Sequence, residues 1–196
     1  KGDFGQGVRH TGGGLSRPAC EARKEGVTVL HWFRKGAAVL LTICCTAGLA
    51  PTALAWLPPS GVAIGGVGLG TTPRQVKKIY GEPTDSRRVY SKSDGAYITQ
   101  YIYGNSYSIT FYELPGGSYA DFVNCSADNG LATPAGVLVG MAESVLTSVY
   151  GKPDAKAEDP TSHITRYVYK ASGGRGEELI FLVQNGKIVN MSACYE

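Results

Sequence analysis

The segment QVKKIYGEP, from Gln75 to Pro83, returns in closely similar form as VLTSVYGKP, from Val145 to Pro153. The two segments start 70 residues apart (145 − 75 = 70), and at that spacing the Tyr-Gly-x-Pro ending of the first falls on that of the second. Glycines upstream match at the same spacing, in GGVGLG (65–70) and AGVLVG (135–140). An ungapped match of this kind indicates a tandem repeat.

The repeated segment has the pattern of a short helix and its end. In the first copy Thr72 is a suitable N-cap and Pro73 suits the first turn, where no hydrogen-bond donor is lost. In the second copy Glu143 falls in the first turn, where a negative charge is favourable. Apolar side chains follow at helical spacing: Val76, Ile79 and Tyr80 in one copy, and Leu146, Val149 and Tyr150 in the other. Glycine and proline then end each helix.

After each helix the pattern changes to the alternation that is typical of strands. The matching runs are 98–103, 107–113 and 120–126 in the first copy, and 164–169, 178–184 and 186–192 in the second, with weaker candidates at 86–92 and 155–159. The turn QNGK (184–187) favours a hairpin. The sequence therefore predicts an α+β fold of two tandem helix-plus-antiparallel-sheet repeats, unit one over 56–130 and unit two over 131–196. Because units of this size are marginal alone, we expect them to share a core or a sheet.

The N-terminal part of the chain resembles a targeting segment. Residues 27–55 contain a short basic stretch, an apolar run and small residues near Ala55, which is the order of a secretory signal peptide. A buried helix and a lasting membrane anchor are the alternatives. Cleavage after Ala55 would leave no lasting anchor and an extracytoplasmic protein, either periplasmic or secreted. Residues 1–26 show no periodicity, and we interpret them as an upstream extension outside the native fold.

Charge and cysteine content narrow the classes of partner. The chain has 19 basic and 16 acidic residues, of which seven and three precede residue 56, so the rest has 12 against 13, a net charge of −1. No basic stripe remains for a phosphate backbone, which argues against nucleic acid as a partner. Beyond residue 55 the cysteines are Cys125 and Cys194. They form either a disulfide or two buried thiols, and an oxidising compartment permits the disulfide.

The repeated helix endings and the tyrosine-rich strands together resemble a known family. The stretches GLGTTPRQVKKIYGEP with YITQYIY, and VGMAESVLTSVYGKP with HITRYVY, resemble tandem BamE-type (SmpA/OmlA-like) envelope domains, and also the β-lactamase inhibitory protein family, which has two such units. The resemblance implies an extracytoplasmic α+β protein that binds other proteins. In the inhibitor family a concave, aromatic-rich sheet face and a hairpin loop contact the enzyme. The chain differs from BamE in having two units and no lipobox cysteine.

Tyrosines alternate with aliphatic residues along two of the predicted strands. If the aliphatic side packs on the helices, an exposed stripe results, and exposed tyrosines are good interface anchors. Its members, the predicted partner-binding residues, are Tyr97, Tyr101, Tyr103, Tyr167 and Tyr169. The alternative places the tyrosines in the core and leaves the side with Gln100 and Arg166 exposed to solvent.

The segment 114–121 is longer than its counterpart in unit two. Its Tyr119 and Asp121 could enter a pocket of a partner, as the inhibitor resemblance implies, and the alternative is a plain surface turn. We expect no catalytic residue, metal or cofactor, since beyond residue 55 only one histidine, His163, is present and no Cys/His cluster.

The sequence thus predicts a non-catalytic module that binds a protein partner in the envelope or outside the cell through a tyrosine-rich sheet face. The alternatives are a structural component of envelope assembly, or an inhibitor of a β-lactamase or protease that acts through 114–121.

Overall fold

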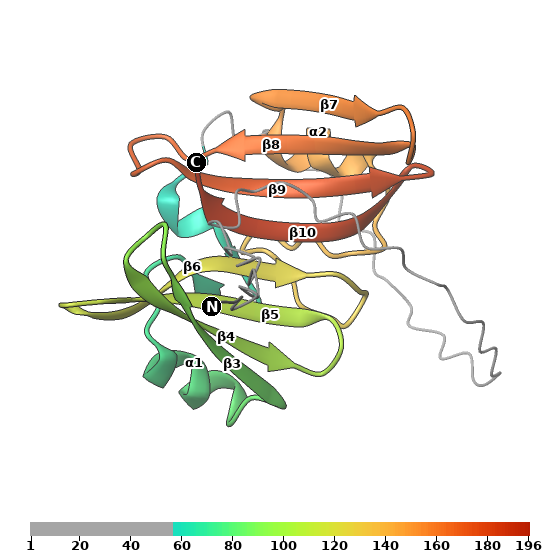
Figure 1. Cartoon of the computed structure of the whole chain (residues 1–196). Coiled ribbons are helices and arrows are strands. Elements are labelled where there is room, and N and C mark those ends of the chain that lie inside the picture. The colour runs from blue at the N-terminus through green and yellow to red at the C-terminus, as the bar shows by residue number, and fades with distance from the viewer. Residues whose placement is uncertain (1–56) are drawn as a thin grey trace, which may run out of the picture.

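The computed structural model describes residues 57–196, and Figure 1 shows how their helices and strands are arranged. The predicted signal peptide and the predicted upstream extension lie outside the described residues. A turn of 3-10 helix, η1 (Pro59–Gly61), comes first. The other elements are β1 (Ala63–Ile64), β2 (Val67–Gly68), α1 (Pro73–Tyr80), β3 (Asp85–Ser91), β4 (Ala96–Tyr103), β5 (Tyr107–Leu114), β6 (Gly117–Cys125), α2 (Ser144–Tyr150), β7 (Ala155–Asp159), β8 (Ile164–Lys170), β9 (Glu177–Gln184) and β10 (Lys187–Tyr195).

Eight strands form one continuous antiparallel sheet in the order β3-β4-β5-β6-β10-β9-β8-β7. Strands β3 to β6 make one half and β7 to β10 the other, and Figure 1 shows the second half above the first. The halves join where β6 pairs with β10, over the four pairs from Met191–Cys125 to Cys194–Phe122. Among residues 57–196, strands β3 and β7 each pair on one side only and are therefore the edges of the sheet.

The predicted fold class is wrong. The described part of the chain is mostly antiparallel sheet, with an eight-stranded and a two-stranded sheet and only two short helices, and it is not built as two helix-plus-sheet repeats. The physical reason is the pairing of β6 with β10. This pairing satisfies backbone groups that would otherwise form two separate sheet edges, and so merges the strands into one sheet.

Helix α1 begins as its sequence predicts. Thr72 and Gln75 form a reciprocal capping box: the Gln75 N–H donates to Thr72 Oγ1 (3.4 Å), and the Thr72 N–H donates to Gln75 Oε1 (2.8 Å). The helix ends at Gly81, whose φ of 77° suits glycine. The predicted apolar stripe is only partly right, because Val76 is buried whereas Ile79 is 53% exposed.

The core lies between one side of the sheet and the two helices. Its members come from both halves and include Val76, Ile109, Leu146 and Phe181, so the halves share one core. We call this side of the sheet the helix side and the other the open side. Neither helix among residues 57–196 is long and apolar enough to span a membrane.

The tyrosine of the repeated Tyr-Gly-x-Pro segment, Tyr80 in the first half and Tyr150 in the second, packs against this core in each half. The ring of Tyr80 lies 5.3 Å from those of Tyr103 and Tyr107. In the second half the ring of Tyr150 lies 5.1 Å from that of Tyr169 and 5.6 Å from that of Phe181. Such aromatic pairs stabilise a core beyond the area they bury. The repeated motif therefore both ends a helix and fixes it to the sheet.

Candidate functional site

An exposed aromatic pair lies on the helix side of the sheet, beyond the reach of α1. Tyr90 on β3 and Tyr97 on β4 face each other across the strand pair, with ring centroids 5.0 Å apart in an edge-to-face arrangement. The two side chains are 53% and 43% exposed. Two neighbouring tyrosines in solvent have much apolar area still to bury and little rotamer freedom to lose, which favours contact with another protein.

Arg88 and Glu113 hold this pair in place. The Arg88 guanidinium lies 3.7 Å from the centre of the Tyr97 ring and donates two hydrogen bonds to Glu113, from Nε to Oε1 (2.8 Å) and from Nη2 to Oε2 (2.7 Å). Thr99 donates a third to Glu113 Oε1 (2.7 Å). Fork-to-fork pairs of this kind fix the orientation of the guanidinium. We call Arg88, Tyr90, Tyr97 and Glu113 the tyrosine–arginine patch.

The pKa of Glu113 predicts how the patch responds to acid. Hydrogen bonds from Arg88, then from Thr99, lower the pKa of this carboxyl from 4.5 to about 2. A depressed pKa stabilises the fold fully above pH 4.5, and this contribution is lost as the pH falls through 2. We expect Glu113→Gln to lower the free energy of unfolding by about 1 kcal/mol at pH 6, the scale of a surface ion pair.

Urea unfolding of wild type and Glu113→Gln between pH 7 and pH 2 checks this prediction. The difference in unfolding free energy should be constant down to about pH 5 and shrink toward pH 2. A difference that stays constant over the whole range would show that the carboxylate charge contributes nothing.

The tyrosines of the predicted stripe differ in their exposure to solvent. Tyr97 is exposed, and Tyr101 and Tyr103 are half-buried against the core. Tyr167 and Tyr169 are each only 3% exposed, so no exposed stripe runs along β8 and that part of the prediction is wrong. Burial raises the pKa of Tyr169 to about 12. The reason is that the helices pack on the tyrosine side of the strands, and the aliphatic side, with Gln100 and Arg166, is the open side.

The predicted loop 114–121 is mostly strand. Leu114 pairs with Gly117, so only Pro115 and Gly116 form the turn, and Tyr119 and Asp121 lie on β6. Leu114 and Tyr119 are nevertheless exposed. The pairing of β6 with β10 extends no further than Phe122, and a shallow pocket of about 450 Å³ lies beside the preceding part of β6. The pocket brings both predicted residues of the segment together with residues that sequence reasoning missed, among them Tyr112, Arg175 and Tyr195.

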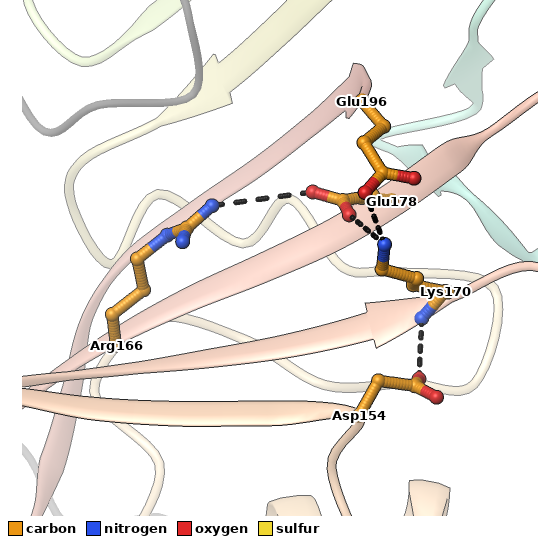
Figure 2. Close-up of polar contacts among 5 residues, drawn as sticks. All are labelled: Asp154, Arg166, Lys170, Glu178 and Glu196. Atoms are coloured by element: carbon orange, nitrogen blue, oxygen red, sulfur yellow. Dashed lines mark hydrogen bonds and ion pairs between the residues drawn. The ribbon is translucent and has the colours of Figure 1, made fainter.

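A charged cluster lies on the open side of the second half (Figure 2). Glu178 on β9 is 5% exposed and is neutralised by Lys170 Nζ at 3.4 Å and Arg166 Nη2 at 3.9 Å. Lys170 also pairs with Glu196, and its N–H donates to Asp154 Oδ2 (2.7 Å). These contacts join residues of β8 and β9 with those just before β7 and after β10. The cluster therefore fixes the register of the second half.

Lys170→Met is expected to lower the free energy of unfolding, because it leaves a buried carboxylate with only the 3.9 Å contact to Arg166. Fully buried pairs lose about 3 to 5 kcal/mol in this way, and the partial exposure of Lys170 reduces the loss. In the double variant Lys170→Met/Glu178→Gln most of the loss should be recovered. Chemical denaturation at pH 7 measures the free energy of unfolding of wild type, the single variant and the double variant. Equal stability of the single and double variants would contradict the prediction.

Cys125 and Cys194 do not form the disulfide that was one of the two alternatives open from sequence. Cys125 is a free, buried thiol, whereas Cys194 is disulfide-bonded. In the pairing of β6 with β10, Cys125 lies opposite Met191, three positions from Cys194. Side chains an odd number of positions apart point to opposite faces of a sheet. Cys125 accordingly belongs to the core, and Cys194 to an apolar cluster on the open side.

Sequence reasoning missed three residues of the patch: Arg88, Tyr90 and Glu113. Alternation along 86–92 offered a signal, since it puts Arg88 and Tyr90 on one side of the strand. Glu113 gave none, because its position beside Arg88 depends on the pairing of β3 with β4 and of β4 with β5. Within residues 57–196 no group of His, Cys, Asp or Glu side chains is placed to hold a metal ion.

Comparisons with known proteins give two structural likenesses. No protein-family model and no curated protein matches the chain. The crystal structure of YjgB, a DUF4309 family protein from Bacillus subtilis, is 13% identical, with a TM-score of 0.36, over 64% of this chain and 79% of its own. A protein from Streptococcus mutans, proposed to be a β-lactamase inhibitor, is 15% identical, with a TM-score of 0.27, over 63% and 82%. The BamE resemblance stays a prediction from sequence.

Proposed function

We propose that the protein is a non-catalytic module that binds a protein partner, and that the tyrosine–arginine patch is its principal contact surface. The observation that carries the proposal is the exposed pair of Tyr90 and Tyr97, with Arg88 stacked on one ring and fixed by Glu113. Tyrosine and arginine are enriched among the residues that dominate binding energy. Because these side chains are already held in one arrangement, a partner would lose little free energy in ordering them.

The patch lies next to the tip of the β5–β6 hairpin. Glu113 is followed directly by the exposed Leu114, and Tyr119 is exposed on the returning strand. Together the patch and the tip form one continuous end of the first half, with aromatic and aliphatic side chains on both sides of the sheet. This proposal replaces the tyrosine face that included Tyr167 and Tyr169. An extracytoplasmic location, with residues 27–55 as the signal peptide, is part of the proposal.

A capture experiment with matched variants tests this function. The full chain is immobilised in an extract of the cells that produce it, beside Tyr90→Ser/Tyr97→Ser and the control Ile79→Ser, which alters an equally exposed side chain on α1. We expect one protein to be retained by wild type and control and lost by the double variant, while circular dichroism shows all three folded. Equal retention by all three would contradict the proposal.

Inhibition assays separate an inhibitor from other binding proteins. The purified chain is titrated against a class A β-lactamase and against a serine protease, with and without Leu114→Ala/Tyr119→Ala. Stoichiometric inhibition that this variant weakens would identify the hairpin tip as the inhibitory element. Absence of inhibition, with partner capture intact, would leave a binding or scaffolding role in envelope assembly.

A further inference from the structure

The patch lies at a free edge of the sheet, and this determines the kind of segment it can accept. Strand β3 pairs with β4 on one side only, and six of its seven residues are exposed. Figure 1 shows β3 at the opposite end of the sheet from the other edge, β7. An edge strand presents N–H and C=O groups that can pair with the backbone of another chain.

The hydrogen bonding of Ser86 shows which backbone groups face outward. The Ser86 N–H donates to Asp85 Oδ1 (2.8 Å), so it does not point toward β4. Because the direction of backbone groups alternates along an antiparallel strand, the N–H and C=O groups of Arg88 and Tyr90 also point away from β4. The side chains of these two residues belong to the patch. The outward backbone groups and the patch therefore coincide in the same two residues.

The two edges of the sheet differ in how they are protected. Strand β7 has five residues, and Lys156, Glu158 and Asp159 are charged. In β3 the charges are confined to the first half, and the exposed residues Val89 and Tyr90 follow. Charged side chains discourage the addition of a strand, whereas apolar and aromatic ones favour it. The second half of β3 is thus the less protected edge.

We propose that an extended segment of the protein partner adds to β3 as a ninth strand, and this inference rests on the proposed function. Its backbone would pair with the outward groups of Arg88 and Tyr90. The partner residues opposite these two would lie on the helix side of the sheet, within about 5 Å of them. An aromatic or β-branched residue fits opposite Tyr90, and an acidic residue fits beside Arg88.

Hydrogen exchange of backbone amides tests the added strand. The probe is a ten-residue peptide selected from a random phage-displayed library on the immobilised full chain. Without peptide, the amides of Arg88 and Tyr90 should exchange quickly and those of Arg87 and Val89 slowly. With peptide, exchange at Arg88 and Tyr90 should slow at least tenfold. Failure to select any peptide, or protection at β7 or the hairpin tip instead, would overturn the inference.

Replacement of a single backbone group provides the control. The α-hydroxy analogue of tyrosine at position 90 removes the outward N–H and keeps the side chain, and it should weaken peptide binding at least tenfold while circular dichroism shows the chain folded. Unchanged binding would overturn strand addition. Protection of the Arg88 and Tyr90 amides that rises with protein concentration, without any peptide, would also overturn it. A second copy of the chain would then occupy the edge. Partner capture that still depends on Tyr90 and Tyr97 would leave the proposed function standing.

Discussion

Phe181→Ala is expected to lower the free energy of unfolding by about 4 kcal/mol, the typical loss for a large aromatic residue removed from a core. Phe181 is fully buried on β9, and its ring lies 5.6 Å from that of Tyr150 and 6.0 Å from that of Tyr169. These three rings fix α2 to the sheet, and the cavity left by the substitution would separate them. Tyr169→Ala should cause a loss of similar size, because Tyr169 is a core residue.

Urea denaturation at pH 7, followed by circular dichroism, measures these losses. Tyr90→Ala is the matched control, an aromatic truncation at an exposed position, and it should change stability by less than about 0.5 kcal/mol. Both tyrosines lie on the helix side of the sheet, so the contrast between Tyr169 and Tyr90 tests how far the core extends along that side. Equal effects of the two substitutions would contradict the assignment of Tyr169 to the core and Tyr90 to the surface.

The double substitution Tyr90→Ala/Tyr97→Ala is expected to lower the affinity for the captured partner about 100-fold, which is about 3 kcal/mol of binding free energy. The two rings support each other and the stacked Arg88, so the loss should be larger than that of either residue alone. Arg88→Ala should weaken binding by at least tenfold, because it removes the stacked cation and frees Glu113.

Biolayer interferometry with the captured partner measures these affinities. Ile79→Ala is the control, since Ile79 is exposed to the same extent as Tyr90 but lies on α1. Its affinity should equal that of wild type within a factor of two. If Ile79→Ala weakens binding as much as the tyrosine substitutions, the contact surface includes α1 and the patch is not its centre.

Local features of the fold could be predicted from sequence because their causes lie within a few residues. The capping box of Thr72 and Gln75 sets the start of α1, and Gly81 sets its end. At the β9–β10 turn, Asn185 and Gly186 have φ values of 52° and 70°, as the Asn-Gly pair predicts. Even the weak candidates for first strands correspond to β3 and β7. In each case short-range sterics and hydrogen bonds decide the outcome.

Long-range features could not be predicted in this way. Alternation along 97–103 separates two sides of a strand, but it does not say which side meets the helices. Arg166 favoured a solvent-exposed aliphatic side, and in the structure it lies on the open side, where it reaches Glu178 on the neighbouring strand. The pairing of Arg88 with Glu113 spans three strands. The positions of Cys125 and Cys194 depend on the junction of β6 with β10.

Site-specific photocrosslinking tests most directly whether the tyrosine–arginine patch contacts a partner. A photoreactive phenylalanine analogue replaces Tyr97 in one form of the full chain and Ile79 in another, and both are irradiated in the extract used for capture. We expect one discrete adduct from position 97, absent from position 79 and abolished by Arg88→Ala. The same adducts from both positions, or none from position 97 while the chain still retains its partner, would show that the protein binds through another surface.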